Sequence, residues 1–141
     1  MKYPLPQLNG SDLAEEQYDD ELRAQVWGLL AALYPHKELT ERRRDTRYPF
    51  PFLVYLTPVA EDDYTPVGEP VVVVGKQLSE HGLGFYHQYP LPFRRVIASL
   101  ENGQGRWFGF LMDLTWCRFT SHGWYESGGK FLQAVLSPLE K

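Results

Sequence analysis

Apolar positions along the chain recur with two different periods. Between Ser11 and Pro35 they fall three or four residues apart, which predicts an amphipathic helix over about residues 12–34. Pro35 ends this pattern, and Asp12 with Glu15 three residues later can cap its start. The apolar face of the predicted helix consists of Tyr18, Leu22, Val26, Leu29, Leu30 and Leu33.

The residues before this helix are expected to form an N-terminal arm without regular secondary structure. The segment MKYPLPQLNG, residues 1–10, holds two prolines and an Asn-Gly pair, which are typical of extended chain and a turn. The first turns of the helix are acidic, and exposed backbone N–H groups favour negative charge there. We therefore interpret the acidic run as a solvated helix start.

Beyond Phe50 the period changes to two, and the residues become β-branched and aromatic in short segments bounded by Pro and Gly. Six strands are expected, at residues 52–59, 69–78, 83–87, 93–100, 106–119 and 124–136. Short connections such as ENGQG favour antiparallel neighbours, and a sheet of this size with a continuous apolar face tends to close into a barrel. The pattern predicts a mainly β protein, a six-stranded antiparallel barrel with an N-terminal helix.

Length and composition set the class of protein. With 141 residues, 43% of them apolar and 15% aromatic, the chain has material for one core. We expect an arm and helix at residues 1–40 and the barrel domain at residues 41–141. A single cysteine, Cys117, cannot form an internal disulfide, which favours a reducing compartment. The sequence has no signal-like or membrane-spanning apolar run, so we expect a cytoplasmic protein without a membrane span.

One basic stretch opposes the net charge of −4, which itself argues against binding of a nucleic-acid polymer. This stretch, ERRRDTRYPF at residues 41–50, contains Arg42, Arg43, Arg44 and Arg47. Guanidinium groups can donate paired hydrogen bonds to a phosphate or a guanine edge and can stack on a base. The alternative is that Glu38 pairs with Arg42 and Glu41 with Arg44, which would make the run ordinary surface charge.

A second candidate site follows an apolar strand, in the segment Gln77-Leu78-Ser79-Glu80-His81-Gly82. Ser79 and Gly82 are expected in a tight turn, where Ser79 offers a hydroxyl and a backbone N–H to a phosphate or a base edge. Gly82 and Gly84 allow a positive φ or a close backbone approach. The alternative is a hairpin loop that simply needs glycine.

Together, the two motifs resemble those of the PilZ family. That family carries Arg-x-x-x-Arg just before the first barrel strand and Asp/Asn-x-Ser-x-x-Gly at a later strand. Arg43 and Arg47 match the first motif, and Ser79 and Gly82 match the second, with Gln77 where Asp or Asn is usual. The resemblance implies a six-stranded antiparallel β-barrel of the bacterial cytosol that binds cyclic di-GMP.

This resemblance spans about residues 41–136 and implies a receptor or adaptor in bacterial second-messenger signalling, with no enzymatic activity. The residues expected to bind the nucleotide are Arg43, Arg47, Gln77, Ser79 and Gly82, with Arg42 or Arg44 assisting. The alternative is a degenerate PilZ-like module that contacts proteins and binds no nucleotide, because the extra methylene of Gln77 displaces its amide. In that case the apolar helix face would serve a protein partner or a second copy of the chain.

The histidines predict no metal or cofactor site. They are His36, His81, His87 and His122. None has a paired ligand spacing with Cys117 or with carboxylates. His81 and His87 flank the serine loop, where they could line a site, but we expect both to be partly exposed and satisfied by the backbone.

The remaining candidates indicate structure more than chemistry. Cys117 is expected to be a small buried apolar residue, and Phe110 and Phe119 are expected in the core because they stand at alternating positions. Aromatic residues of this half, Trp116 among them, could instead stack bases in a groove. An enzyme would gain support only if a cleft brought Ser79 or Cys117 next to a histidine.

Overall fold

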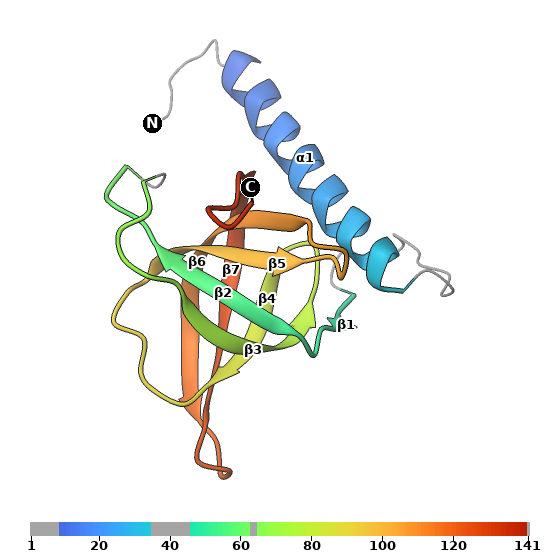
Figure 1. Ribbon diagram of the computed structural model, residues 1–141. Helices are drawn as coiled ribbons and strands as arrows, with labels where there is room; N and C mark the ends of the chain where they lie inside the picture. The colour runs from blue at the N-terminus through green and yellow to red at the C-terminus, as the bar shows by residue number, and fades with distance from the viewer. Residues whose placement is uncertain (1–8, 35–45, 63–64, 141) are drawn as a thin grey trace.

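The computed structural model describes residues 9–34, 46–62 and 65–140 (Figure 1). One helix, α1 (Asn9–Leu33), precedes the strands in this part of the chain, and it is not long and apolar enough to cross a membrane. The strands are β1 (Tyr48–Pro49), β2 (Leu53–Pro58), β3 (Val71–Leu78), β4 (Gly82–His87), β5 (Arg95–Glu101), β6 (Trp107–Phe119) and β7 (Tyr125–Val135).

Six strands close into an antiparallel barrel, which confirms the predicted fold class. Neighbours pair in the order β3, β2, β5, β6, β7 and β4, and the pairing of β4 with β3 closes the ring. The short β1 was not predicted. It pairs with β3, Tyr48 opposite Leu78, and lies ahead of β2 along the same edge of β3.

The inward faces of the strands form a single core. Val54, Leu56 and Phe85 have no exposed surface, and Phe110, buried as predicted, stacks on Phe131 with 4.6 Å between ring centroids. Burial of one such side chain contributes about 2 kcal/mol, so this core is the main source of stability.

Helix α1 completes this core. Leu22, Val26, Leu29 and Leu30 are buried in the same apolar cluster as the barrel residues, and the helix contacts β6 and β7. The prediction that this helix face serves a partner or a second copy is therefore wrong for Leu22, Val26 and Leu29, because the barrel already covers them. Leu33, also assigned to that face, is partly buried against the same core. The side chain of Tyr18 lies outside the described part.

The start of the helix also differs from the prediction. The expected turn at the Asn-Gly pair is absent from the described chain, because α1 begins at Asn9 and continues through Gly10 and Asp12. Asp12 therefore stands inside the helix and cannot cap its start. Asn is tolerated at a helix start, and one Gly costs only about 1 kcal/mol, which a following amphipathic run can offset. Residues 1–8 and the proposed boundary between residues 40 and 41 lie outside the described residues.

The far end of β6 contradicts two burial predictions. Phe119 is 64% exposed, and Cys117 is exposed as well. Strand β5 pairs with β6 only from Trp107 to Asp113, whereas β7 pairs with β6 as far as Phe119. The β6–β7 hairpin thus extends beyond the rest of the barrel (Figure 1), where alternating positions no longer separate core from solvent.

Candidate functional site

The register of β1 on β3 brings the two sequence motifs together. Tyr48 lies opposite Leu78, and Pro49 lies opposite Gln77. Because the strands are antiparallel, the residue before Tyr48 stands next to the residue after Leu78. Arg47 and Ser79 are therefore neighbours in space at this edge of the sheet.

Both residues line one cleft of about 470 Å³ on the barrel surface. Its lining residues are Arg47, Gln77, Ser79, His81, Gly82, Leu83, Gly84, Trp116, Gly129 and Lys130. The cleft thus gathers Arg47, Gln77, Ser79 and Gly82 from the predicted set. Arg42, Arg43 and Arg44 lie outside the described residues, and so do the alternative ion pairs of Glu38 and Glu41. Nucleotide binding by all of these residues stays a prediction.

Ser79 and Gly82 form the expected tight turn. The Ser79 N–H donates to the Gly82 carbonyl at 3.0 Å, and the His81 N–H donates to Ser79 Oγ at 3.2 Å. The expectation that the Ser79 N–H serves an anion is therefore wrong, because the turn itself uses this donor. The hydroxyl hydrogen of Ser79 remains able to donate, since a hydroxyl both accepts and donates.

Glycines form the floor of the cleft because the backbones approach closely there. A Cβ at Gly82 would overlap the carbonyl oxygen of Gly129, and a Cβ at Gly84 would lie 3.2 Å from Gln77 Cγ. The suggested positive φ is wrong for both. The positive-φ glycines of the described residues are Gly68, Gly103, Gly105 and Gly123.

Trp116 of β6 also lines the cleft. It pairs with Gly128 across β6 and β7, and its indole lies against that glycine so closely that a Cβ there would overlap the ring. The residue is nevertheless 44% exposed. A flat aromatic face next to cationic groups is suited to stacking on a planar base. The sequence suggested base stacking for this half only in general terms.

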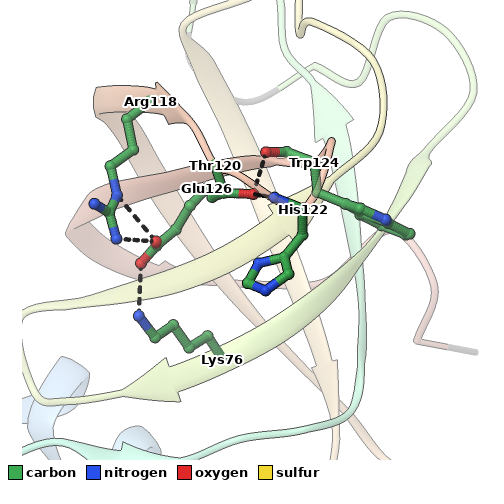
Figure 2. Close-up of polar contacts among 6 residues, drawn as sticks. All are labelled: Lys76, Arg118, Thr120, His122, Trp124 and Glu126. Atoms are coloured by element: carbon green, nitrogen blue, oxygen red, sulfur yellow. Dashed lines mark hydrogen bonds and ion pairs between the residues drawn. The ribbon is translucent and has the colours of Figure 1, made fainter.

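A charged network joins Lys76, Arg118 and Glu126 (Figure 2). Lys76 Nζ is 2.7 Å from Glu126 Oε2, and Arg118 Nη2 is 2.7 Å from Glu126 Oε1. Lys76 adjoins Gln77, and Glu126 precedes Gly128 by two residues, so its side chain shares a strand face with that glycine. The network holds two positive charges and one negative charge. Together with Arg47 and the unpredicted Lys130, it gives this face a positive balance on an acidic chain.

The pKa values of this network are displaced in opposite directions. The hydrogen bond from Lys76 lowers the pKa of Glu126, and Arg118 adds to that effect, while burial opposes it. The hydrogen bond to Glu126 raises the pKa of Lys76. Both groups are therefore held in their charged forms.

Figure 2 also shows the turn at the end of the β6–β7 hairpin. Thr120 Oγ1 donates to the Trp124 carbonyl at 2.8 Å and closes this turn.

A second cavity, of about 330 Å³, is lined by Cys117 and His87 together with Ser127. His87 is buried, so its expected partial exposure is wrong. Its Nδ1 is 2.7 Å from the Tyr89 carbonyl oxygen, and its Nε2 is 2.7 Å from Ser127 Oγ. The cavity thus gathers Cys117 with a histidine, which was the condition for an enzyme to gain support, but both ring nitrogens of His87 have partners other than the Cys117 thiol. His36 lies outside the described residues.

Metal-ligand side chains are dispersed over the fold. Within residues 9–34, 46–62 and 65–140, no group of three or more His, Cys, Asp or Glu residues could hold a metal ion. His81 borders the first cleft, and His122 is exposed in the hairpin turn.

Comparison with known proteins gives one structural likeness. No protein-family model and no curated protein matches the chain. A solved complex of K. pneumonia MrkH with c-di-GMP aligns with a TM-score of 0.46 and 15% sequence identity. The alignment covers 67% of this chain and 46% of the MrkH chain, so the chain spans less than half the length of that protein.

Proposed function

We propose that the chain is a receptor for cyclic di-GMP that acts as an adaptor in bacterial second-messenger signalling, in the cytoplasm and without catalysis. The observation that carries the proposal is the meeting of Arg47 and Ser79 in one cleft through the register of β1 on β3. These two residues belong to the motifs on which the resemblance to the PilZ family rests, and nothing in the local sequence required them to meet.

The chemistry of the cleft suits a cyclic dinucleotide. Arg47 and Lys130 offer cationic donors to phosphate oxygens, and the Ser79 hydroxyl can add a third donor. The Gln77 amide carries both a donor and an acceptor, as the edge of a guanine requires, and Trp116 offers a face for stacking. A volume of about 470 Å³ lies within the usual range of small-molecule sites.

By the resemblance, Arg43 would be the second arginine that binds the ligand, with Arg42 or Arg44 assisting. On the same basis, this arginine four residues before Arg47 would hold the other phosphate. Two guanidinium groups against two phosphates are the strongest interactions available to such a ligand, because charge-assisted bidentate pairs exceed neutral hydrogen bonds.

Isothermal titration of the full chain with cyclic di-GMP tests the proposal. We expect Arg47→Ala and Arg43→Ala each to weaken binding about tenfold to a hundredfold, because a hydrogen bond to a charged group contributes about 1.5–3 kcal/mol. Arg106→Ala is the matched control, since Arg106 is exposed in the β5–β6 turn and does not line the cleft. Cyclic di-AMP in place of cyclic di-GMP should bind less tightly.

The same titration can reject the receptor proposal. If the wild-type chain gives no heat and no rise in melting temperature at high micromolar cyclic di-GMP, the receptor proposal is rejected. The alternative of a PilZ-like interaction module that binds no nucleotide would then stand.

The proposed absence of catalysis needs its own test, because Ser127 Oγ lies 2.7 Å from His87 Nε2 in the second cavity, within the distance at which a histidine can activate a serine. A fluorophosphonate probe labels activated serines. We expect no labelling that depends on Ser127, and labelling of the wild type that Ser127→Ala removes would contradict this part of the proposal.

A further inference from the structure

Glu80 lies within the Ser79–Gly82 turn, but its side chain does not line the cleft. Its carboxylate is buried, with 7% of the residue exposed, and Oε2 accepts a hydrogen bond from Trp27 Nε1 on α1. Arg23 Nε lies 3.3 Å from Oε1 as an ion pair, and Arg23 also approaches Asp20 at 3.6 Å. The turn that carries Ser79 is thus linked to α1 through the contacts of Glu80 with Trp27 and Arg23.

Trp27 also contacts the β1 segment that follows Arg47. Its ring packs edge-to-face on Tyr48, with centroids 5.7 Å apart and an interplanar angle of 73°. Tyr48 directly follows Arg47 in the chain, and Tyr34 OH donates to the carbonyl of Pro49. One helix therefore contacts both the β1 segment that follows Arg47 and the turn that carries Ser79.

The burial of Glu80 makes this connection energetically significant. A buried carboxylate that loses its cation and its hydrogen-bond donor carries a large desolvation cost. If α1 left the barrel near Trp27, Glu80 would have to reach water, and the turn would have to change its conformation. The docked helix and the present shape of the turn consequently depend on each other.

We infer that Trp27 and Glu80 are positioning residues of the site, which rests on the proposed function. They hold the Arg47 segment and the Ser79 turn at the separation that one ligand can bridge. The ligand and the docked end of α1 then favour the same conformation, so each stabilises the other by the same free energy. Through this contact, ligand binding in the cleft stabilises the docked state of the C-terminal half of α1.

The test uses the full chain and four variants. Trp27→Phe keeps an aromatic ring but removes the N–H that Glu80 accepts, and Glu80→Gln keeps an oxygen acceptor but removes the charge paired with Arg23. Glu80→Ala removes both functions. Trp124→Phe is the matched control, because Trp124 is a half-exposed tryptophan in the distant hairpin turn.

We expect Trp27→Phe and Glu80→Ala to weaken cyclic di-GMP binding about tenfold, whereas Glu80→Gln has a smaller effect and Trp124→Phe binds as the wild type. Hydrogen exchange should show that cyclic di-GMP slows the amides in the C-terminal half of α1 in the wild type but not in Trp27→Phe. Unchanged affinity in Trp27→Phe and Glu80→Ala, with α1 indifferent to the ligand, would overturn the inference.

The inference is also tested without any ligand, so that its failure is distinguishable from that of the proposed function. The Ser79 N–H donates to Gly82, and the Phe131 N–H donates to the His81 carbonyl at 2.8 Å, which makes both amides reporters of the turn. Trp27→Phe should speed the exchange of both relative to Trp124→Phe. Equal exchange in the two variants would refute the coupling, whether or not the wild type binds cyclic di-GMP.

Discussion

Tyr48 stands opposite Leu78 in the antiparallel pair of β1 with β3, and this register decides where the two sequence motifs meet. A shift by one residue would turn the side chains of this segment to the other face of the sheet. Arg47 and Ser79 would then no longer line one cleft. The observed register therefore keeps the positive charge of Arg47 beside the turn that carries Ser79.

Trp116 is expected to contribute to ligand binding by stacking. Because base stacking on an aromatic side chain contributes about 1–3 kcal/mol, Trp116→Ala should weaken cyclic di-GMP binding about tenfold to a hundredfold, and Trp116→Phe should retain most of the affinity. Phe119→Ala, which removes another exposed aromatic side chain of β6, is the control. Equal loss in both alanine variants, measured by titration, would argue against a specific stacking role.

Gln77 is expected to limit the affinity. Its side chain lies against Gly84 and is one methylene longer than the residue usual at this place in the PilZ motif. Gln77→Asn should raise the affinity about tenfold, because a short amide can bond its own turn and recover one hydrogen bond to the ligand. Gln88→Asn, at an exposed position outside the cleft, controls for the exchange itself. Weaker binding by Gln77→Asn would show that the longer side chain is adapted to this site.

Gly82 is expected to tolerate no side chain. A Cβ there would overlap the backbone of Gly129, so Gly82→Ala should lower the free energy of unfolding by about 1–3 kcal/mol, as overpacking does. Gly84→Ala should cost less, since it meets only the flexible Gln77 side chain. Gly28→Ala in α1 meets no atom within 4 Å and should stabilise the chain by about 0.5–1 kcal/mol. Denaturant unfolding measures all three, and equal stability of Gly82→Ala and Gly84→Ala would contradict this account.

The ion network around Glu126 should make stability depend on pH. Folding lowers the pKa of Glu126 below its ordinary value of 4.5, so its contribution is present above that value and is lost as the pH falls through the lower folded-state pKa. Folding raises the pKa of Lys76 above 10.5, so its contribution is present below that value and is lost as the pH rises through the higher one.

Glu126→Gln should therefore be less stable than the wild type by about 1.5–3 kcal/mol near pH 7, as expected for hydrogen bonds to a charged group. The difference should shrink in acid as the pH falls through the lowered folded-state pKa of Glu126, where the wild-type carboxylate itself becomes protonated. Glu61→Gln, at an exposed loop position, is the control. Urea unfolding at several pH values checks this, and a difference that stays constant down to pH 2 would exclude the network as its cause.

Helix α1 is expected to be necessary for the stability of the barrel. Leu29 is fully buried in the common core, so Leu29→Ala should cost about 3 kcal/mol, whereas Leu136→Ala, at a residue 82% exposed, should cost little. Deletion of residues 1–34 should destabilise the chain further, because it removes Leu22, Val26, Leu29 and Leu30 from the core at once. A deletion variant with an unchanged melting temperature would show that the helix is dispensable.

Local patterns were sufficient for most of the fold. The periods of 3.6 and 2 located α1 and the six barrel strands to within a few residues, because side-chain direction depends only on the backbone of each element. Pro35 marked the end of the helix, and β4 begins at Gly82, one residue before the predicted start. The predicted helix start was wrong at Asn9, where Asn and Gly also fit a turn. The predicted burial of Phe119 was wrong because β6 extends beyond the strands that pair with its first half.

The sequence by itself determined the kinds of element and two short motifs, since spacing and residue type act over a few positions. Only the tertiary structure decided which residues share the cleft. Trp116 and Lys130 reach it through the register of β6, β7 and β4, and Glu80 faces Trp27 across fifty-three positions of chain. Such contacts depend on strand register and on packing between distant segments, and the spacing of residues within one segment contains no information about either.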